Sequence, residues 1–251
     1  MYRDLNNKNI ILTGGSGFLG RQITNSFLKN KSNIYILDIK KPSFKSKKIV
    51  YFKCDITDEH QVKEVVKKIK SKKIDILINN AANDYVPIKT KRKITFENFE
   101  INKWINDLKV GLTGSFICTK VFGSLMAKNK GGVILNISSD LGIIAPDQNL
   151  YKDLKFKKPV TYSVVKHGLN GLTKYTASYW ANKNIRCNAI APGGIENNQN
   201  KKFLNKLKKV IPMGRLAKKN EYNNLILFMC SDASSYMTGS IVVADGGRTI
   251  I

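Results

Sequence analysis

Tyr162 and Lys166 are the two side chains whose types and spacing could most readily do chemistry. They lie four residues apart in the segment Tyr-Ser-Val-Val-Lys, and residues four apart on an α-helix share one face. A lysine ammonium beside a tyrosine hydroxyl favours the phenolate, which lowers the tyrosine pKa from its usual value of about 10. The pair could then act as a general acid/base near neutral pH. The spacing alone is equally compatible with an unrelated, solvated tyrosine and lysine.

A glycine-rich segment near the start of the chain predicts a dinucleotide-binding turn. Residues 13–20 read Thr-Gly-Gly-Ser-Gly-Phe-Leu-Gly and lie between an apolar run and an amphipathic one. Glycines let a backbone turn sharply and approach a pyrophosphate, and a helix N-terminus offers free N–H groups and a positive dipole end. We favour dinucleotide binding over a plain turn. The expected contacts come from Gly14, Ser16, Gly17, Phe18, Leu19 and Gly20.

Asp38 predicts which dinucleotide is bound. It ends the second apolar run, some 20 residues after the glycine turn. A carboxylate at this distance can bind the adenosine ribose hydroxyls and would repel a 2′-phosphate. NAD is therefore favoured over NADP, although Lys40 and Lys41 follow closely and could accept a phosphate.

Polar or small residues end the next three apolar runs as well. Asp55, beside Ile56, could bond the adenine amine or equally cap the helix that begins near Asp58. The fourth run closes with Asn79-Asn80-Ala81-Ala82, where small residues allow close approach to a cofactor and Asn side chains can join neighbouring strands. Ser139 ends the fifth run and could hydrogen-bond a substrate carbonyl or alcohol, or simply cap a turn.

Short apolar runs alternate with longer amphipathic ones along the chain. Several runs, such as 34–37 and 133–137, are almost continuously apolar, as is typical of parallel strands covered on both faces. We predict strands at 9–13, 33–38, 49–54, 74–78, 133–138, 185–191 and 240–243, and helices at 18–30, 58–71, 97–108, 112–129, 161–183 and 219–231. The alternation indicates an α/β fold with a doubly wound, mainly parallel seven-stranded sheet and helices on both faces. Ligands bind such a sheet at the carboxyl ends of its strands.

Composition limits the remaining function classes. The 251 residues contain no Pro/Gly/Ser-rich linker, so we expect one domain, 1–251. The net charge of +25 can indicate a nucleic-acid or membrane surface. Only six of the 43 basic residues are arginine, and they do not cluster with aromatic residues. We therefore favour a compositional bias over a dedicated nucleic-acid surface.

The cysteines predict the compartment. All four are widely separated and make no metal-ligand spacing with the two histidines, which indicates buried free thiols in a reducing cytosol and no metal site. No signal peptide precedes the first strand, and no unbroken apolar run reaches the roughly 18 residues of a membrane span. A cytoplasmic protein without a membrane partner is expected.

The ordered motifs together resemble the short-chain dehydrogenase/reductases nearly from end to end. They are Thr-Gly-x-x-Gly-x-x-Gly, Asn-Asn-Ala-Ala, Asn-Ile-Ser-Ser, Tyr-x-x-x-Lys, Asn-Ala-Ile-Ala-Pro-Gly-Gly at 188–194 and Asp-Gly-Gly at 245–247. The resemblance implies a Rossmann-type fold and an NAD(P)-dependent enzyme that transfers a hydride between nicotinamide and a carbonyl or secondary alcohol. It assigns Tyr162 as general acid/base, Lys166 as the residue that lowers its pKa and holds the nicotinamide ribose, and Ser139 as the residue that orients the reacting oxygen. Pro192, Gly193 and Ile195 would lie beside the nicotinamide.

Three features depart from the family pattern. Phe18 stands where the middle glycine usually falls, and Gly17 gives the spacing of the longer sugar-nucleotide epimerases and dehydratases. Gly111 stands where the family often has an Asn that supports a proton relay, so water or another side chain must rebuild the relay. The stretch between Ser139 and Tyr162 is longer than usual, and its polar, lysine-rich excess at 145–159 should reshape the substrate pocket.

The insertion carries a finer resemblance, to dehydrogenases of bacterial surface-carbohydrate and flagellin-modification pathways. It hints at a polar small-molecule substrate, such as a sugar or amino-sugar derivative, while a plain lysine-rich surface loop is an equally open interpretation. We predict pocket segments at 143–160 and 196–218, the second as a polar lid with Asn197 near the cofactor carboxamide. The alternatives are an epimerase or dehydratase that uses NAD transiently, and a non-catalytic NAD- or nucleic-acid-binding protein.

Helices 112–129 and 161–183 have apolar residues on more than one face. A helix that covers a sheet needs only one apolar stripe, so a second stripe is most simply buried against another copy of the chain. The family resemblance points the same way. We expect a homodimer or homotetramer.

Overall fold

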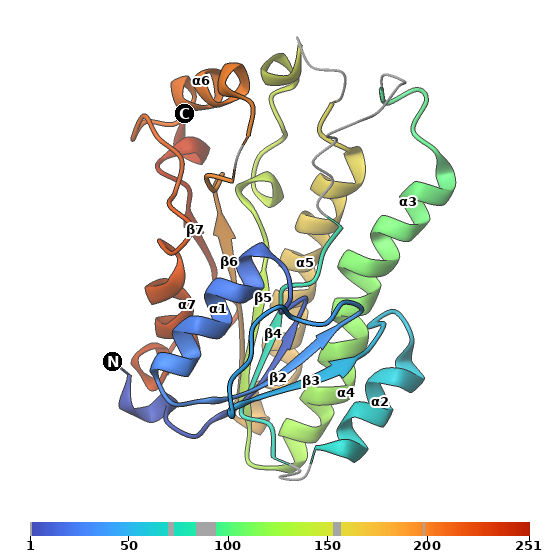
Figure 1. Ribbon diagram of the computed structural model, residues 1–251, viewed down its shortest axis with the longest axis vertical. Helices are drawn as coiled ribbons and strands as arrows, with labels where there is room; N and C mark the ends of the chain where they lie inside the picture. Colours follow the sequence, from blue (N-terminus) through green and yellow to red (C-terminus); the bar gives the residue numbers. More distant parts are fainter. Residues whose placement is uncertain (1, 70–72, 84–93, 153–156, 198) are drawn as a thin grey trace.

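Seven parallel strands form one sheet in the computed structural model, which describes residues 2–69, 73–83, 94–152, 157–197 and 199–251 (Figure 1). The strand order is β3-β2-β1-β4-β5-β6-β7, and all six neighbouring pairs are parallel. The crossover direction reverses between β1 and β4, which is where such sheets bind ligands. The strands are β1 Asn9–Thr13, β2 Asn33–Asp38, β3 Ile49–Lys53, β4 Ile76–Asn79, β5 Gly132–Ile137, β6 Ile185–Pro192 and β7 Ile241–Ala244.

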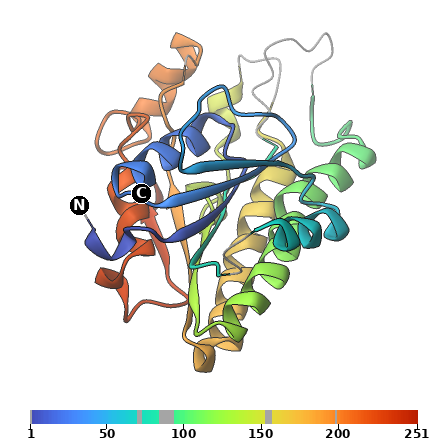
Figure 2. The ribbon, with the colours of Figure 1, turned by 60° about the horizontal axis from the view of Figure 1, so that its bottom comes forward.

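Helices cover both faces of the sheet (Figures 1 and 2). One face carries α1, Phe18–Lys29, and α7, Asn223–Cys230, while the other carries α2, Glu59–Lys68, α4, Gly114–Lys128, and α5, Val160–Tyr179. Alternate residues of β1 serve the two sides, since Ile10 and Leu12 belong to one buried apolar cluster and Ile11 to the other. This period of two is what a strand buried on both faces requires.

The predicted fold class and strands are confirmed, with strand ends within two residues of the predicted positions. Several helices begin later than predicted. The helix predicted from 58 begins at Glu59 because Asp58 caps it, accepting hydrogen bonds from the backbone N–H groups of His60 and Gln61. The predicted end of this helix, 70–71, lies outside the described residues.

The helix predicted at 97–108 is shorter and does not stop where predicted. As α3 it begins at Ile101, and beyond Leu108 the chain continues through a π-helical segment, Lys109–Thr113, into α4. The combined run Ile101–Lys128 is long and apolar enough to cross a membrane by length and composition, but half of its most apolar window is buried inside the protein. We interpret it as a core helix.

Segment 196–218 contains a helix that the sequence did not reveal. This helix, α6, spans Lys201–Lys209 and is capped by Asn200, whose side chain accepts a hydrogen bond from Lys202 N. It lies beyond the carboxyl ends of the strands (Figure 1). A third apolar cluster joins it to the 3-10 turn Gln148–Tyr151 of the insertion; its buried members are Leu150, Tyr151, Leu207, Ile211 and Leu216.

All four cysteines are buried free thiols, as predicted. Burial, with the charges of Asp55 and Asp58, raises the pKa of the Cys54 thiol to about 11. Burial likewise raises the pKa of Cys187 and of Cys230 to about 12. These thiols therefore stay protonated and unreactive at neutral pH.

Candidate active site

Tyr162 and Lys166 share one face of α5, as their spacing predicted. The helix begins at Val160, directly after Pro159, whose fixed φ suits a helix start. Lys166 is only 5% exposed, and its Nζ donates a 2.7 Å hydrogen bond to the carbonyl oxygen of Ile137 at the end of β5. The same Nζ lies 5.6 Å from the centre of the Tyr162 ring. A desolvated ammonium is thus held beside the phenol at the carboxyl edge of the sheet.

The segment after β5 is fastened to α5 by hydrogen bonds. Ser138 Oγ donates to Lys166 O at 3.2 Å, Ser163 Oγ donates to Leu141 O at 3.0 Å, and Asn170 Nδ2 donates to Gly142 O at 2.8 Å. A Cβ at Gly142 would lie 2.8 Å from Ser138 Oγ and 3.0 Å from the Lys166 backbone. The glycine therefore permits the close approach that brings Ser139 to the helix bearing Tyr162.

Ser139 is 4% exposed and has partners of its own. Its Oγ donates a 2.7 Å hydrogen bond to Asp140 Oδ1 and accepts one of 3.2 Å from Leu141 N. Asp140 Oδ2 in turn accepts a 2.6 Å hydrogen bond from Arg248 Nη1. The capping interpretation of Ser139 is thus correct, and its role toward a substrate oxygen stays a prediction.

A small cavity of about 20 Å³ opens beside the Tyr162–Lys166 pair, with room for about one water molecule. Asp107, 6% exposed, contributes a carboxylate to its wall and accepts hydrogen bonds from Thr161 Oγ1 at 2.6 Å and Asn83 Nδ2 at 3.2 Å. The cavity is lined by Ala82, Asn83, Asp107, Gly111, Pro159, Thr161, Tyr162, Val165 and Lys166.

Gly111 shows why the family's Asn is missing from this wall. It lies in the π-helical segment, and a Cβ there would lie 2.6 Å from Val165 Cγ1. Any larger side chain would therefore collide with α5. The polar group that this stretch presents to the cavity comes instead from Asp107, one helical turn earlier.

The glycine turn after β1 closely approaches the chain that follows β4. Gly14 has φ +64°, and a Cβ there would lie 2.8 Å from Ala81 Cα. Asn80 Nδ2 donates to the carbonyls of Thr13 and Gly14, each at 3.0 Å, which confirms that this Asn joins neighbouring strands. Helix α1 begins directly after Gly17. Because Gly17 has no side chain, it cannot cap the backbone N–H groups of the first helical turn.

Asp38 lies next to this turn. Its Oδ2 accepts a 3.0 Å hydrogen bond from Ser16 N, and its Oδ1 accepts one of 2.9 Å from Lys40 N. Each carboxylate oxygen has two lone pairs, so one on each is left for ribose hydroxyls. Lys40 uses its backbone N–H to hold the carboxylate.

Asp55 does not cap α2, because Asp58 does so. Its Oδ1 accepts a 2.9 Å hydrogen bond from Thr57 N instead. The capping alternative is therefore wrong. The adenine alternative stays a prediction, and the neighbouring Ile56 is 5% exposed and packs against Gly114 of α4.

The Pro-Gly-Gly segment after β6 is anchored by the C-terminal part of the chain. A Cβ at Gly193 would lie 2.8 Å from Asp245 Cα, and Gly193 O accepts a 3.2 Å hydrogen bond from the Tyr222 hydroxyl. Burial, with the charge of Asp140, raises the pKa of Tyr222 well above its usual value, so this hydroxyl remains a donor. Ile195 pairs with Ala217, which fixes the base of segment 196–218 beside the sheet.

The fold and these motifs define a nicotinamide-dependent oxidoreductase of the Rossmann type, and comparison with known proteins identifies its family. Residues 19–249 match the family model described as Enoyl-(Acyl carrier protein) reductase. The chain is 33% identical to a 3-oxoacyl-[acyl-carrier-protein] reductase of Thermotoga maritima, over 98% of this chain and 99% of that protein. It is 28% identical to post-translational flagellin modification protein A of Campylobacter coli, over 97% and 98% of the two chains.

A solved structure agrees with the sequence relatives. A short-chain dehydrogenase of Leptospira borgpetersenii with bound NAD⁺ superposes with a TM-score of 0.89, is 31% identical, and is matched over 97% of this chain and 93% of its own. The chain belongs to the short-chain dehydrogenase/reductase family. It is an oxidoreductase that uses NAD(P), and the glycine turn and Asp38 fit that cofactor.

Sequence reasoning missed three charged residues near this site: Asp107, Asp140 and Arg248. Asp140 directly follows Ser139, and Arg248 directly follows Asp-Gly-Gly. The only signal in the sequence for this pair was that each residue adjoins a recognised motif. Nothing in the sequence predicts that residues 140 and 248 lie together.

Proposed function

We propose that Tyr162, Lys166 and Ser139 interconvert a secondary alcohol and a carbonyl on a small polar substrate, with a sugar or amino-sugar derivative as the substrate class. The observation that carries the proposal is the burial of Lys166 against Ile137 O and the Tyr162 ring. A buried ammonium favours the phenolate of a neighbouring tyrosine, which makes that tyrosine able to take and return a proton.

Each residue has a separate task in this mechanism. The bound nicotinamide supplies or receives the hydride. Tyr162 exchanges the proton of the reacting hydroxyl, Lys166 supports its charge and holds the nicotinamide ribose, and Ser139 orients the reacting oxygen. Asp107 lines the same cavity. We propose that the proton path, which Gly111 cannot provide, runs from Asp107 through one water molecule in this cavity.

The cofactor contacts follow the motif positions, and NAD is the preferred form. Asp38 is held by two backbone N–H groups with its remaining lone pairs available, which suits ribose hydroxyls and disfavours a 2′-phosphate. The other proposed contacts are Gly14, Ser16, Gly17, Phe18, Leu19, Gly20, Asp55, Ile56, Asn80, Ala81, Ala82, Tyr162, Lys166, Pro192, Gly193 and Ile195.

Segments 143–160 and 196–218 form the proposed substrate wall of a single domain, 1–251. Their packing supports this, because the ring of Tyr151 in the insertion contacts that of Phe203 in α6, with ring centres 5.3 Å apart and planes tilted by 41°. Lys158 Nζ lies 3.6 Å from the centre of the Tyr162 ring, which brings a cation of the insertion to the catalytic tyrosine. The likeness to a post-translational flagellin modification protein agrees with the finer resemblance that the insertion carries in the sequence.

The test is turnover, followed by NADH absorbance, with a panel of polyols, aldohexoses and amino sugars in both directions. Tyr162→Phe keeps the ring but removes the transferable proton, so turnover should fall by a factor of about 10² or more while NADH affinity is nearly unchanged. Lys166→Ala should lower both turnover and NADH affinity. Net NADH production also separates a dehydrogenase from an epimerase that recycles its NAD. Turnover near that of the wild type in Tyr162→Phe would contradict the mechanism.

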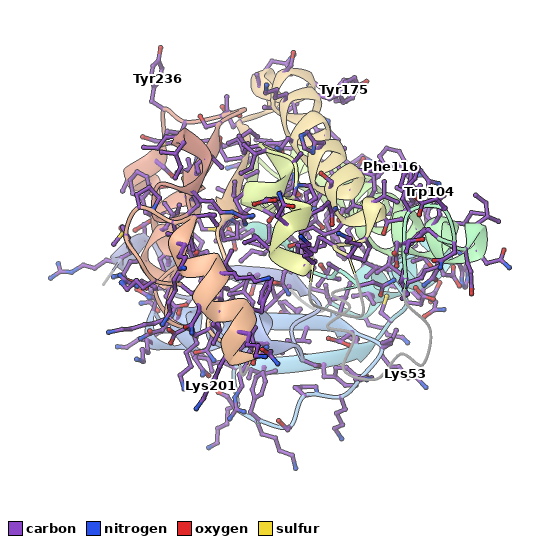
Figure 3. The ribbon with its side chains drawn as sticks, turned by 90° about the horizontal axis from the view of Figure 1, so that it is seen from above. Lys53, Trp104, Phe116, Tyr175, Lys201 and Tyr236 are labelled. Carbon is purple, nitrogen blue, oxygen red and sulfur yellow. The ribbon has the colours of Figure 1, made fainter. Side chains whose placement is uncertain are left out.

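We further propose that the chain works as a homodimer or homotetramer in the cytoplasm. Large apolar side chains are exposed on the outer side of α3, α4 and α5, and Figure 3 shows Trp104, Phe116 and Tyr175 along one side of the molecule. Phe116 is 49% and Tyr175 69% exposed. A second copy would cover them. Light scattering at micromolar concentration decides the matter, and a mass near 28.2 kDa would contradict the proposal.

A further inference from the structure

Lys158, near the end of the insertion, lies against the face of the Tyr162 ring. Its Nζ is 3.6 Å from the ring centre, and Lys166 Nζ is 5.6 Å from the same centre. An ammonium as close as that of Lys158 must lie over the ring face, because the ring's own atoms exclude so short an approach along its edge. The proposed general acid/base therefore has two cations beside it, and the mechanism so far uses only one.

The position of Lys158 is set by the proline that follows it. A proline restricts the preceding residue to extended backbone, and Pro159 directly precedes α5. Pro159 is buried, and its carbonyl oxygen accepts a 3.1 Å hydrogen bond from Tyr162 N. Lys158 therefore reaches the ring from just before the helix, whereas Lys166 reaches it from one turn further along α5.

A carboxylate at the same site shows why a second cation would matter. Asp107 of α3 is buried and lines the cavity beside Tyr162. A negative charge there disfavours a second negative charge on the tyrosine. The charged residues of the segment after β5 do not compensate, because Asp140 is already neutralised by Arg248 in a 2.6 Å ion pair.

We propose that Lys158 is a positioning residue of the active site, whose ammonium over the Tyr162 ring stabilises the phenolate against the carboxylate of Asp107. The phenol oxygen lies in the ring plane close to the centre, so this cation falls within the roughly 4–6 Å over which an opposite charge favours an ionised group. The ring of a phenolate also carries part of the negative charge, so it attracts the cation more strongly than a neutral ring does.

This inference gives the insertion a task in the chemistry as well as in the substrate wall. Tyr162 would accept the proton of an alcohol at a lower pH than the Tyr162–Lys166 pair alone allows. The inference rests on the proposed function, because the ionised form matters for catalysis only if Tyr162 exchanges that proton.

The ionisation of Tyr162 can be measured without substrate or cofactor. Tyrosinate has its own near-ultraviolet absorbance, but the chain contains ten tyrosines. Each pH titration is therefore compared with that of the same protein carrying Tyr162→Phe, and the difference reports this one hydroxyl. Lys158→Met keeps an unbranched side chain that can still pack on the ring and removes the charge. We expect it to raise the pKa of Tyr162 by about 1 pH unit, which lowers the phenolate fraction near neutral pH about tenfold.

Two further variants separate charge from packing. Lys158→Arg keeps the charge and can stack on the ring, so the pKa of Tyr162 should stay close to that of the parent. Lys157→Met is the matched control, because it removes the neighbouring charge of the same segment. Lys157 Nζ donates a 3.2 Å hydrogen bond to Gln148 O, and its loss should move the pKa of Tyr162 far less. In the active enzyme, Lys158→Met should shift the pH profile of alcohol oxidation upward by the same amount as the titration.

A Tyr162 pKa that does not change with Lys158→Met, or that changes equally with Lys157→Met, would overturn the inference, since the lysine would then be only a packing contact. Circular dichroism melting confirms that each variant is folded, and Lys158→Gln, which also removes the charge, replaces the methionine variant if that one is unstable. The proposed function fails separately, if Tyr162→Phe retains turnover; the absorbance titration would still show whether Lys158 controls the ionisation of the tyrosine.

Discussion

Gly111→Ala is a substitution for which backbone propensity and packing predict opposite signs. In an open helical position, alanine would be favoured over glycine by about 1 kcal/mol. Here a Cβ would lie 2.6 Å from Val165 Cγ1 and 3.4 Å from Val165 Cγ2, whereas carbon atoms normally approach to about 3.5–4.0 Å. Val165 is 5% exposed on α5, and a valine in a helix has one strongly preferred rotamer, so it cannot easily turn away.

Overpacking of this kind costs about 1–3 kcal/mol, which exceeds the gain in propensity. We therefore expect Gly111→Ala to lower the free energy of unfolding by about 1 kcal/mol. Val165→Ala removes the atoms that clash, so in that background Gly111→Ala should be neutral or stabilising. The coupling between the two substitutions should reach about 1–2 kcal/mol, as expected for residues in contact.

The assay is urea unfolding followed by far-UV circular dichroism, at one protein concentration because association would shift the midpoint. Gly168→Ala, which brings a Cβ to 2.9 Å from the end of the flexible Leu112 side chain, is the matched control and should cost less. A Gly111→Ala protein as stable as the wild type, or an equal cost in both backgrounds, would refute the steric account of Gly111.

Three further predictions concern the cofactor, the thiols and the pocket. Asp38→Ala should narrow the preference for NAD over NADP, measured by fluorescence titration of both reduced cofactors, and equal affinities in the wild type would contradict the assignment. The Cys54 thiol has a pKa raised from 9.0 to about 11, so between pH 9 and pH 11 the thiol ionises in the unfolded chain but not in the folded one. The urea concentration at the midpoint of unfolding should therefore fall as the pH rises above about 9. The fall should be less steep in Cys54→Ala. Tyr151→Ala should raise KM for the best substrate of the panel and leave NADH affinity intact, with the exposed Tyr236→Ala as control; an unchanged KM would favour a plain surface loop.

The sheet could be predicted because its strands carry their own signal. Buried parallel strands such as Ile34–Leu37 are continuously apolar, and the turn residues between elements are local features. Helix α6 was missed. Its apolar residues Phe203, Leu204 and Leu207 do recur at helical spacing, which was the available signal. Lysines make up more than half of Lys201–Lys209, and this composition favoured the interpretation as a polar lid. The contact of the apolar residues with Leu150 and Tyr151, some 50 residues earlier in the chain, could not be predicted from spacing.

The candidate site shows the same division between local and distant information. The positions of Ser139, Tyr162 and Lys166 were readable because their motifs are short and each lies at the edge of a strand or on one helix face. Their partners were not, because Asp107 meets Thr161 across 54 residues and Asp140 meets Arg248 across 108. Spacing in the sequence carries no information about which buried carboxylate meets which donor.

The Asp-Gly-Gly motif has a structural role that the family resemblance alone did not predict. Gly246 and Gly247 have φ of +70° and +90°, and a Cβ at either would come within 3 Å of Ile211 or Pro212. Only glycine allows both conformations beside those neighbours. The two residues turn the chain sharply after β7, and this turn brings Arg248 back to Asp140 beside the carboxyl end of β5. The motif therefore serves the site at a distance: its glycines shape the backbone, and the arginine that follows them reaches the hydroxyl of Ser139 through one carboxylate.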